Sequence, residues 1–140
     1  MLKSVLTAAI AAAGFLAAAS AGATAADARG DWVRANGASK IRITSCGNAL
    51  CGKLIWLRTP RNDTKNPDTA KRDRPLLGID IVQSMKPTGK GGQWKGKVYN
   101  AEDGKTYTGF IALEGAEKLK LEGCVMGGLI CKGETWTRAQ

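Results

Sequence analysis

Apolar and polar residues alternate along most of this chain, and turn sequences interrupt the alternation at short intervals. Ile41 and Ile43, for example, alternate with Lys40, Arg42 and Thr44. A period of two is that of a β-strand with one buried face. Helical periodicity is nearly absent after the first 26 residues, so the chain is predicted to be all-β.

Glycine-containing turns divide the alternation into eight segments. The predicted strands cover residues 30–35, 39–46, 51–58, 76–84, 93–99, 105–113, 117–125 and 129–138. Because most connections are short, we expect a single antiparallel eight-stranded meander that closes into a barrel without free edges. An open β-sheet or a sandwich is the alternative.

One connection, between the third and fourth strands, is long. Residues 58–75 form a polar stretch with six basic and three acidic side chains. Ordered loops of this length are uncommon in compact domains and often functional. The stretch is predicted either to cover the barrel mouth as a lid, with a helical turn near residues 68–72, or to be a mobile charged surface loop.

The last strand departs from the simple pattern. Strict alternation places Lys132 and Glu134 on the same face as the apolar Trp136. We expect a bulge at Gly133 to reset the register of this strand.

Residues 1–26 have the organisation of a cleavable secretory signal. Lys3 precedes an apolar run over residues 5–19, and Ala23-Thr24-Ala25 matches a cleavage site. We expect cleavage near Ala25/Ala26, a helical conformation where the segment is retained, and a periplasmic or secreted protein with no membrane span. Residues 27–140 are then one small domain.

Four cysteines form two close pairs, each symmetric about a turn. Cys46 and Cys51 flank residues 47–50, and Cys124 and Cys131 flank a two-residue Gly127-Gly128 turn. Directly opposed strand residues lie within disulfide range, so we predict the bonds Cys46–Cys51 and Cys124–Cys131. These spacings are longer than those of zinc knuckles, and no metal or cofactor is expected.

The folded part of the chain is basic. The 21 Lys and Arg residues less Lys3, against 12 Asp and Glu, give residues 27–140 a net charge of +8. In an exported protein this charge favours an acidic ligand, an anionic envelope surface or an acidic protein partner over nucleic acid. The chain contains no histidine and no nucleophile–base, phosphate-loop or dinucleotide motif, so we expect no enzymatic activity.

A series of short motifs runs along nearly all of residues 30–138. They are Gly30-Asp31-Trp32, Ile43 to Gly47, Leu50 to Lys53, Asn66-Pro67-Asp68, Arg74 to Gly78, Trp94 to Asn100, Glu102 to Tyr107 and Thr135 to Arg138. In this order they resemble the bacterial exported family known as domain of unknown function 2147 (DUF2147). The resemblance implies no established reaction and no catalytic residues.

A broader resemblance concerns the two ends of the predicted barrel. Gly30 and Trp32 on the first strand, with Arg138 on the last, are similar to the structural signature of lipocalins and related calycin barrels. The resemblance implies a lipocalin-like barrel in which Arg138 packs across Trp32 and closes one end through a cation–π contact.

Two functions are compatible with these features. In the first, the barrel binds a small apolar or amphipathic ligand, with Trp56, Trp94 and Tyr107 lining the interior and Arg72 and Arg74 meeting an acidic head group. Plain core packing is the competing explanation for Trp94 and Tyr107, and solvated or structurally paired side chains are the competing explanation for Arg72 and Arg74.

In the second, the protein is a cell-envelope interaction module. Lys95, Lys97, Lys118 and Lys120 would then form an outward basic stripe that binds an anionic surface or an acidic protein.

Overall fold

The computed structural model describes residues 9–14 and 27–140. Residues 9–14 are exposed and carry no regular secondary structure, so the helix expected in this part of the predicted signal is not found. The rest of the predicted signal, with its cleavage site, lies outside the described residues. Within the described ranges, no helix has the length and apolar character needed to cross a membrane.

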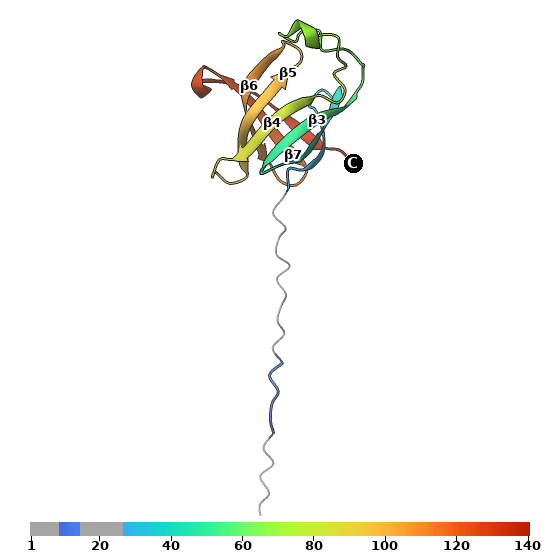
Figure 1. The fold of residues 1–140 in the computed structure, drawn as a ribbon. Helices are drawn as coiled ribbons and strands as arrows, with labels where there is room; N and C mark the ends of the chain where they lie inside the picture. The colour runs from blue at the N-terminus through green and yellow to red at the C-terminus, as the bar shows by residue number, and fades with distance from the viewer. Residues whose placement is uncertain (1–8, 15–26) are drawn as a thin grey trace, which may run out of the picture.

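Eight antiparallel strands form one closed barrel (Figure 1). Each strand pairs with its neighbours in sequence, and the first pairs with the last, so the predicted meander barrel is confirmed. The strands are β1 (Gly30–Val33), β2 (Ser39–Cys46), β3 (Ala49–Leu57), β4 (Asp80–Pro87), β5 (Gln93–Asn100), β6 (Lys105–Leu113), β7 (Lys118–Val125) and β8 (Ile130–Arg138).

The predicted strand boundaries are close to the observed ones, with the largest difference in β4. This strand begins at Asp80 because the four residues before it form a turn, in which the Ile79 amide donates a 3.2 Å hydrogen bond to the Leu76 carbonyl. The loop between β3 and β4 therefore extends from residue 58 to residue 79.

Side chains fill one half of the barrel completely. At Gly109 a Cβ atom would lie 2.3 Å from Cγ2 of Val98 and 2.9 Å from Cε of Met85, so this interior has no room for another methyl group. The largest fully buried side chains here are those of Trp32, Ile41, Ile43, Val82, Met85, Ile111 and Leu119.

Arg138 closes the filled end, which we call the closure end. Its guanidinium carbon lies 4.3 Å from the centroid of the Trp32 ring. The guanidinium also donates hydrogen bonds of 2.7–3.0 Å to three carbonyl oxygens, those of Asp27, Arg29 and Ala116. Gly30 has a φ of +128°, and a Cβ there would lie 2.6 Å from Nη1 of Arg138, so glycine is required beside this arginine.

Both predicted disulfides are present, at opposite ends of the barrel. Cys46–Cys51 joins β2 to β3 beside the closure end, and Cys124–Cys131 joins β7 to β8 at the other end. Cys124 and Cys131 are directly opposed, as predicted. The turn beyond them spans the four residues 126–129, with the 3₁₀ turn η2 (Met126–Gly128), rather than the two glycines alone.

The predicted bulge at Gly133 is wrong. The pairing of β7 with β8 continues without a register shift from Val125 opposite Ile130 to Lys118 opposite Thr137. Lys132, Glu134 and Trp136 therefore share the inner face of β8. The interior accepts these charges because this half of the barrel is hollow.

Candidate functional site

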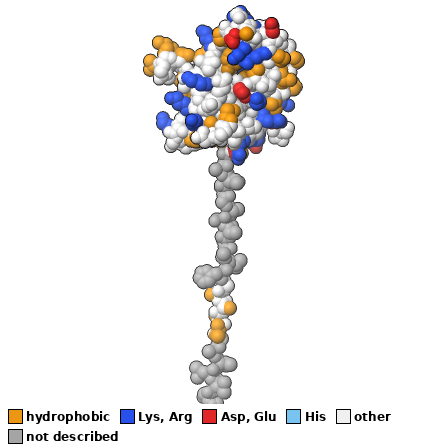
Figure 2. Space-filling model, viewed as in Figure 1, with side chains coloured by type: hydrophobic (Ala, Val, Ile, Leu, Met, Phe, Trp, Pro, Cys, Tyr) orange, Lys and Arg blue, Asp and Glu red, His pale blue; other side chains and the backbone are white. Residues whose placement is uncertain are grey.

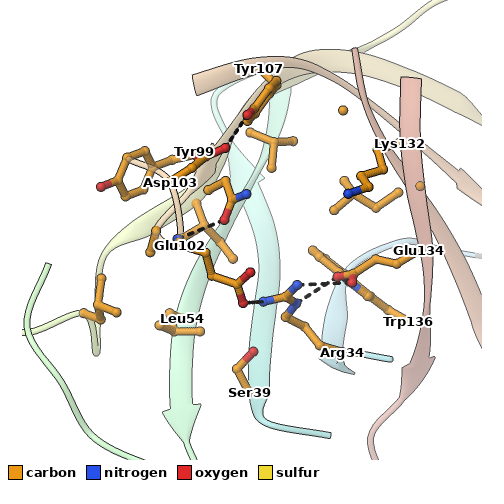
Figure 3. A pocket seen from close by; sticks show the side chains of 18 of the residues that line it. Arg34, Ser39, Leu54, Tyr99, Glu102, Asp103, Tyr107, Lys132, Glu134 and Trp136 are labelled. Carbon is orange, nitrogen blue, oxygen red and sulfur yellow. Dashed lines mark hydrogen bonds and ion pairs between the residues drawn. The ribbon is translucent and has the colours of Figure 1, made fainter. Parts of the chain in front are cut away.

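A cavity of about 600 Å³ lies in the half of the barrel away from the closure end, which we call the cavity end (Figure 3). The β1–β2 and β5–β6 turns, the long loop and the β7–β8 hairpin surround it. Its apolar wall is formed mainly by Leu54, Leu57, Leu76, Ile81, Val98 and Leu121. Its polar groups are concentrated where the strands end, at the mouth.

Arg34 and Glu134 form an ion pair on one side of the mouth. Nε and Nη2 of Arg34 donate hydrogen bonds of 2.8 and 3.1 Å to the two carboxylate oxygens, and Nε1 of Trp136 donates one of 2.5 Å. Burial alone would raise the pKa of Glu134, but the hydrogen bonds from Arg34 and Trp136 outweigh it and hold that pKa below its usual value. An oxygen of Glu102 lies 3.9 Å from Nη1 of the same arginine.

Asp103 and Tyr107 form a second pair, in which the Tyr107 hydroxyl donates to the carboxylate. Burial acts to raise the pKa of Asp103, but the hydrogen bonds from Tyr107 and from the Lys105 amide lower it overall. The same contact with Asp103 raises the pKa of Tyr107. The tyrosine therefore remains a neutral donor facing the cavity.

Two basic side chains at the cavity, Arg61 and Lys132, are not neutralised. Within the part of the chain that the structure describes, no carboxylate lies within 4 Å of either cation. The charged side chains of the lining balance, with three basic residues against the acidic Glu102, Asp103 and Glu134. Arg61 and Lys132 nevertheless remain free to contact an acidic group, because neither is held by a carboxylate of the described residues.

The buried carboxylate of Asp63 fixes the long loop to the barrel. It accepts hydrogen bonds from the Tyr99 hydroxyl at 2.5 Å, from Nδ2 of Asn66 at 2.8 Å and from Nε of Arg74 at 3.0 Å. Burial acts to raise the pKa of Asp63, but these three donors hold it below its ordinary value. Burial, and then the bond to Asp63, raise the pKa of Tyr99 to about 12.

Further contacts make the loop an ordered wall of the cavity. Nε of Arg72 donates a 2.8 Å hydrogen bond to the Asn66 carbonyl, beside the 3₁₀ turn η1 (Thr69–Lys71). Gly104, in the β5–β6 turn, packs so tightly on the loop that a Cβ would lie 1.8 Å from the carbonyl oxygen of Lys65. The loop thus lies over the cavity end, and the alternative of a mobile surface loop is not supported.

The structure brings one of the five predicted ligand-binding residues, Tyr107, to the cavity. Trp56 is 40% exposed on the outer face, where Nζ of Lys40 lies 5.3 Å from its ring centroid. Trp94 packs partly buried against the core near the closure end. Arg72 and Arg74 donate hydrogen bonds to Asn66 and Asp63 within the loop, which agrees with the alternative that these arginines have structural partners.

Sequence reasoning missed the charged residues of the cavity, chiefly Arg34, Arg61, Lys132 and Glu134. A signal for two of them was present in the strict alternation of Lys132, Glu134 and Trp136. Without a bulge at Gly133, that alternation places both charges inside the barrel, where the structure has them.

The barrel is similar to a solved structure whose description is that protein HP1028 from the human pathogen Helicobacter pylori belongs to the lipocalin family. The TM-score is 0.73 and the sequence identity 23%, over 81% of this chain and 84% of the other. At this identity the similarity shows the lipocalin-like fold alone. A search of curated proteins finds no match.

The family model described as "Uncharacterized protein conserved in bacteria (DUF2147)" matches residues 30–138. The match extends from the first residue of β1 to the last residue of β8 and so includes the closure end, the long loop and the cavity. On this match, the chain belongs to the DUF2147 family of bacterial proteins.

Proposed function

We propose that this protein is an exported carrier that binds one small amphipathic molecule with an acidic group inside its barrel. The observation that carries the proposal is the cavity of about 600 Å³, with its apolar wall and two cations at its mouth, Arg61 and Lys132, that no carboxylate of the described residues contacts. Ligand pockets have volumes of roughly 300–1,000 Å³ and are mostly apolar with a few placed polar groups.

The arrangement of the lining suggests an orientation for the ligand. The apolar part would lie against Leu54 and Leu121, and the acidic group would lie near the mouth, where Arg61 and Lys132 come from the loop and from β8. Charge-assisted hydrogen bonds to an acidic group are stronger than those between neutral groups.

The carboxylates of the cavity favour binding over catalysis. A general acid needs a raised pKa, as the acid of a glycosidase does. The pKa values of Glu134 and Asp103 are shifted in the opposite direction, and both groups are held by donors.

Export is supported by the two disulfides together with the signal sequence predicted over residues 1–26. Disulfides persist in oxidising compartments, such as the bacterial periplasm. We therefore infer that the protein binds its ligand outside the cytoplasm.

Native mass spectrometry of the protein purified from the periplasm is the first test, because a tightly held ligand would co-purify. The second is titration with dodecanoate and with dodecanol, which share an apolar tail but differ in head-group charge. We expect dodecanoate to bind more tightly, and Lys132→Ala to weaken its binding about tenfold while leaving dodecanol binding unchanged.

The control variant is Lys95→Ala, which removes an exposed lysine on the outer face of β5, where its Nζ lies 5.7 Å from the Phe110 ring. It should bind both probes as the wild type does. Ligand-free spectra together with no binding of either probe would refute the carrier function.

A further inference from the structure

The β7–β8 hairpin ends in a projecting apolar tip. We use "hydrophobic tip" for residues 125–130, which contain two glycines and no polar side chain. Its four larger side chains are exposed by 39%, 69%, 84% and 57%, in the order Val125, Met126, Leu129 and Ile130. The tip stands out from the barrel as the red hairpin in Figure 1, and its hydrophobic side chains form a projecting group in Figure 2.

The fold holds this tip in place and does not bury it. The Cys124–Cys131 disulfide crosses the hairpin directly at the base of the tip. Met126 has a φ of +54°, in the left-handed region that glycine or asparagine adopts more readily. A long apolar side chain that is both exposed and in an unfavourable backbone conformation contributes nothing to the core, so its use lies outside the barrel.

The size and shape of the tip argue against a protein partner. A stable protein interface uses about 20–30 residues on each side, and six residues on a convex tip are far fewer. A second copy of this chain would also bring a second +8 charge to the contact. A lipid bilayer requires no complementary pocket, and a few apolar side chains suffice to enter its interface when basic residues lie nearby.

Basic residues lie beside the tip. Lys132 lies two residues after Ile130 on β8. Lys97 on β5 is level with Cys124 at the base of the tip, because both residues pair with Thr108 on the strand between them. Both lysines are exposed, and Figure 2 shows several basic side chains on the same face as the tip. We propose that the hydrophobic tip docks this barrel onto the surface of an anionic phospholipid bilayer.

Docking would set the cavity next to the lipid. Val125 and Ile130 belong both to the tip and to the cavity lining. On the proposed carrier function, an amphipathic ligand would then pass between bilayer and cavity along these two side chains. This consequence rests on the carrier function, whereas the docking does not.

Co-flotation of the periplasmically purified protein with vesicles tests the docking. We expect binding to vesicles of phosphatidylglycerol mixed with phosphatidylcholine, weaker binding to phosphatidylcholine alone, and a decrease as salt screens the charges. Failure to bind the anionic vesicles at low salt overturns the proposal.

The decisive variant is Met126→Gln with Leu129→Gln, and the matched control is Leu77→Gln, which changes a 54% exposed leucine in the long loop. We expect the double variant to bind anionic vesicles at least about tenfold more weakly, and the control to bind as the wild type does. Thermal unfolding should be unchanged in both, since none of these side chains belongs to the core.

Equal binding by the double variant and the wild type would overturn the role of the tip. So would self-association of the wild type that the double variant abolishes, because the tip would then be a contact between copies. Dodecanoate binding is measured without vesicles. If the wild type binds dodecanoate but no anionic vesicles, the docking alone is refuted. If it binds the vesicles but no dodecanoate, the carrier function alone is refuted.

Discussion

Asp63 shows how much one side chain contributes to the cavity end. It is fully buried, yet it is charged, because three donors from the loop and from β5 satisfy its carboxylate. A buried charge is tolerated only with such partners. The hydroxyl of Tyr99 connects the centre of the loop to the barrel wall, so this hydrogen bond contributes to holding the loop in place.

We expect Tyr99→Phe to destabilise the protein by about 1.5–3 kcal/mol at neutral pH, the range for a hydrogen bond to a charged group. The pKa of Tyr99 is raised from 10.0 to about 12 in the folded state. The stability that its hydroxyl contributes is therefore fully present below pH 10 and is lost as pH rises from 10 to 12. Chemical unfolding of both proteins across this range should show the difference between them shrinking.

Tyr107→Phe is the control for this prediction, since its hydroxyl also bonds a carboxylate but lies at the mouth, near solvent. Its effect on the free energy of unfolding should be smaller at every pH. A constant difference between wild type and Tyr99→Phe from pH 9 to 12 would contradict the assigned role of Tyr99.

At the scale of elements, β6 shows how one strand serves both halves of the barrel. Its inner face carries Ile111 and Gly109 in the filled half and Tyr107 in the cavity lining. Position 109 requires glycine because the side chains of Val98 and Met85 occupy the space that a Cβ atom would need. The boundary between filled and hollow interior is therefore set by side-chain volume along the strand.

Gly109→Ala should destabilise the barrel by about 1–3 kcal/mol, because the new methyl group would overpack a filled interior. Gly91→Ala, in the β4–β5 turn with open space around its Cβ position, should have little effect. Urea denaturation measures both variants. Adding Val98→Ala to Gly109→Ala should recover part of the loss, and no recovery would show that the cost is not one of volume.

For the whole molecule, the two disulfides act at opposite ends of a barrel that is already closed by hydrogen bonds. Each links the strands of one hairpin and closes a short segment, with sequence separations of 5 and 7. The chain-entropy estimate for such segments is only about 2 kcal/mol each. The disulfides thus stabilise two hairpins, while the eight-stranded ladder specifies the fold.

We therefore expect replacement of either cysteine pair by alanine to cost about 2 kcal/mol, with additive effects because the two sites share no contacts. The free energies of unfolding of the two double variants and the quadruple variant test this. A quadruple variant that loses much more than the sum would show that the ends are coupled. Its circular dichroism should still be that of a β-protein.

The sequence by itself determined the strands, their order and the two disulfides. Alternation with a period of two and local turn residues are short-range properties, and opposed cysteines around a turn are close in any hairpin. Gly30, Trp32 and Arg138 could be assigned to one end because strands at the two termini meet when a meander closes.

Only the tertiary structure decided what fills the barrel and what remains hollow. The charge of Glu134 is tolerated inside because it pairs with Arg34, about a hundred residues earlier in the chain, and Arg74 is not free because it pairs with the buried Asp63. Such pairings exist only after the strands close. The cavity and the two cations at its mouth that no carboxylate of the described residues contacts follow from these long-range contacts, since no local pattern records which charges will find partners.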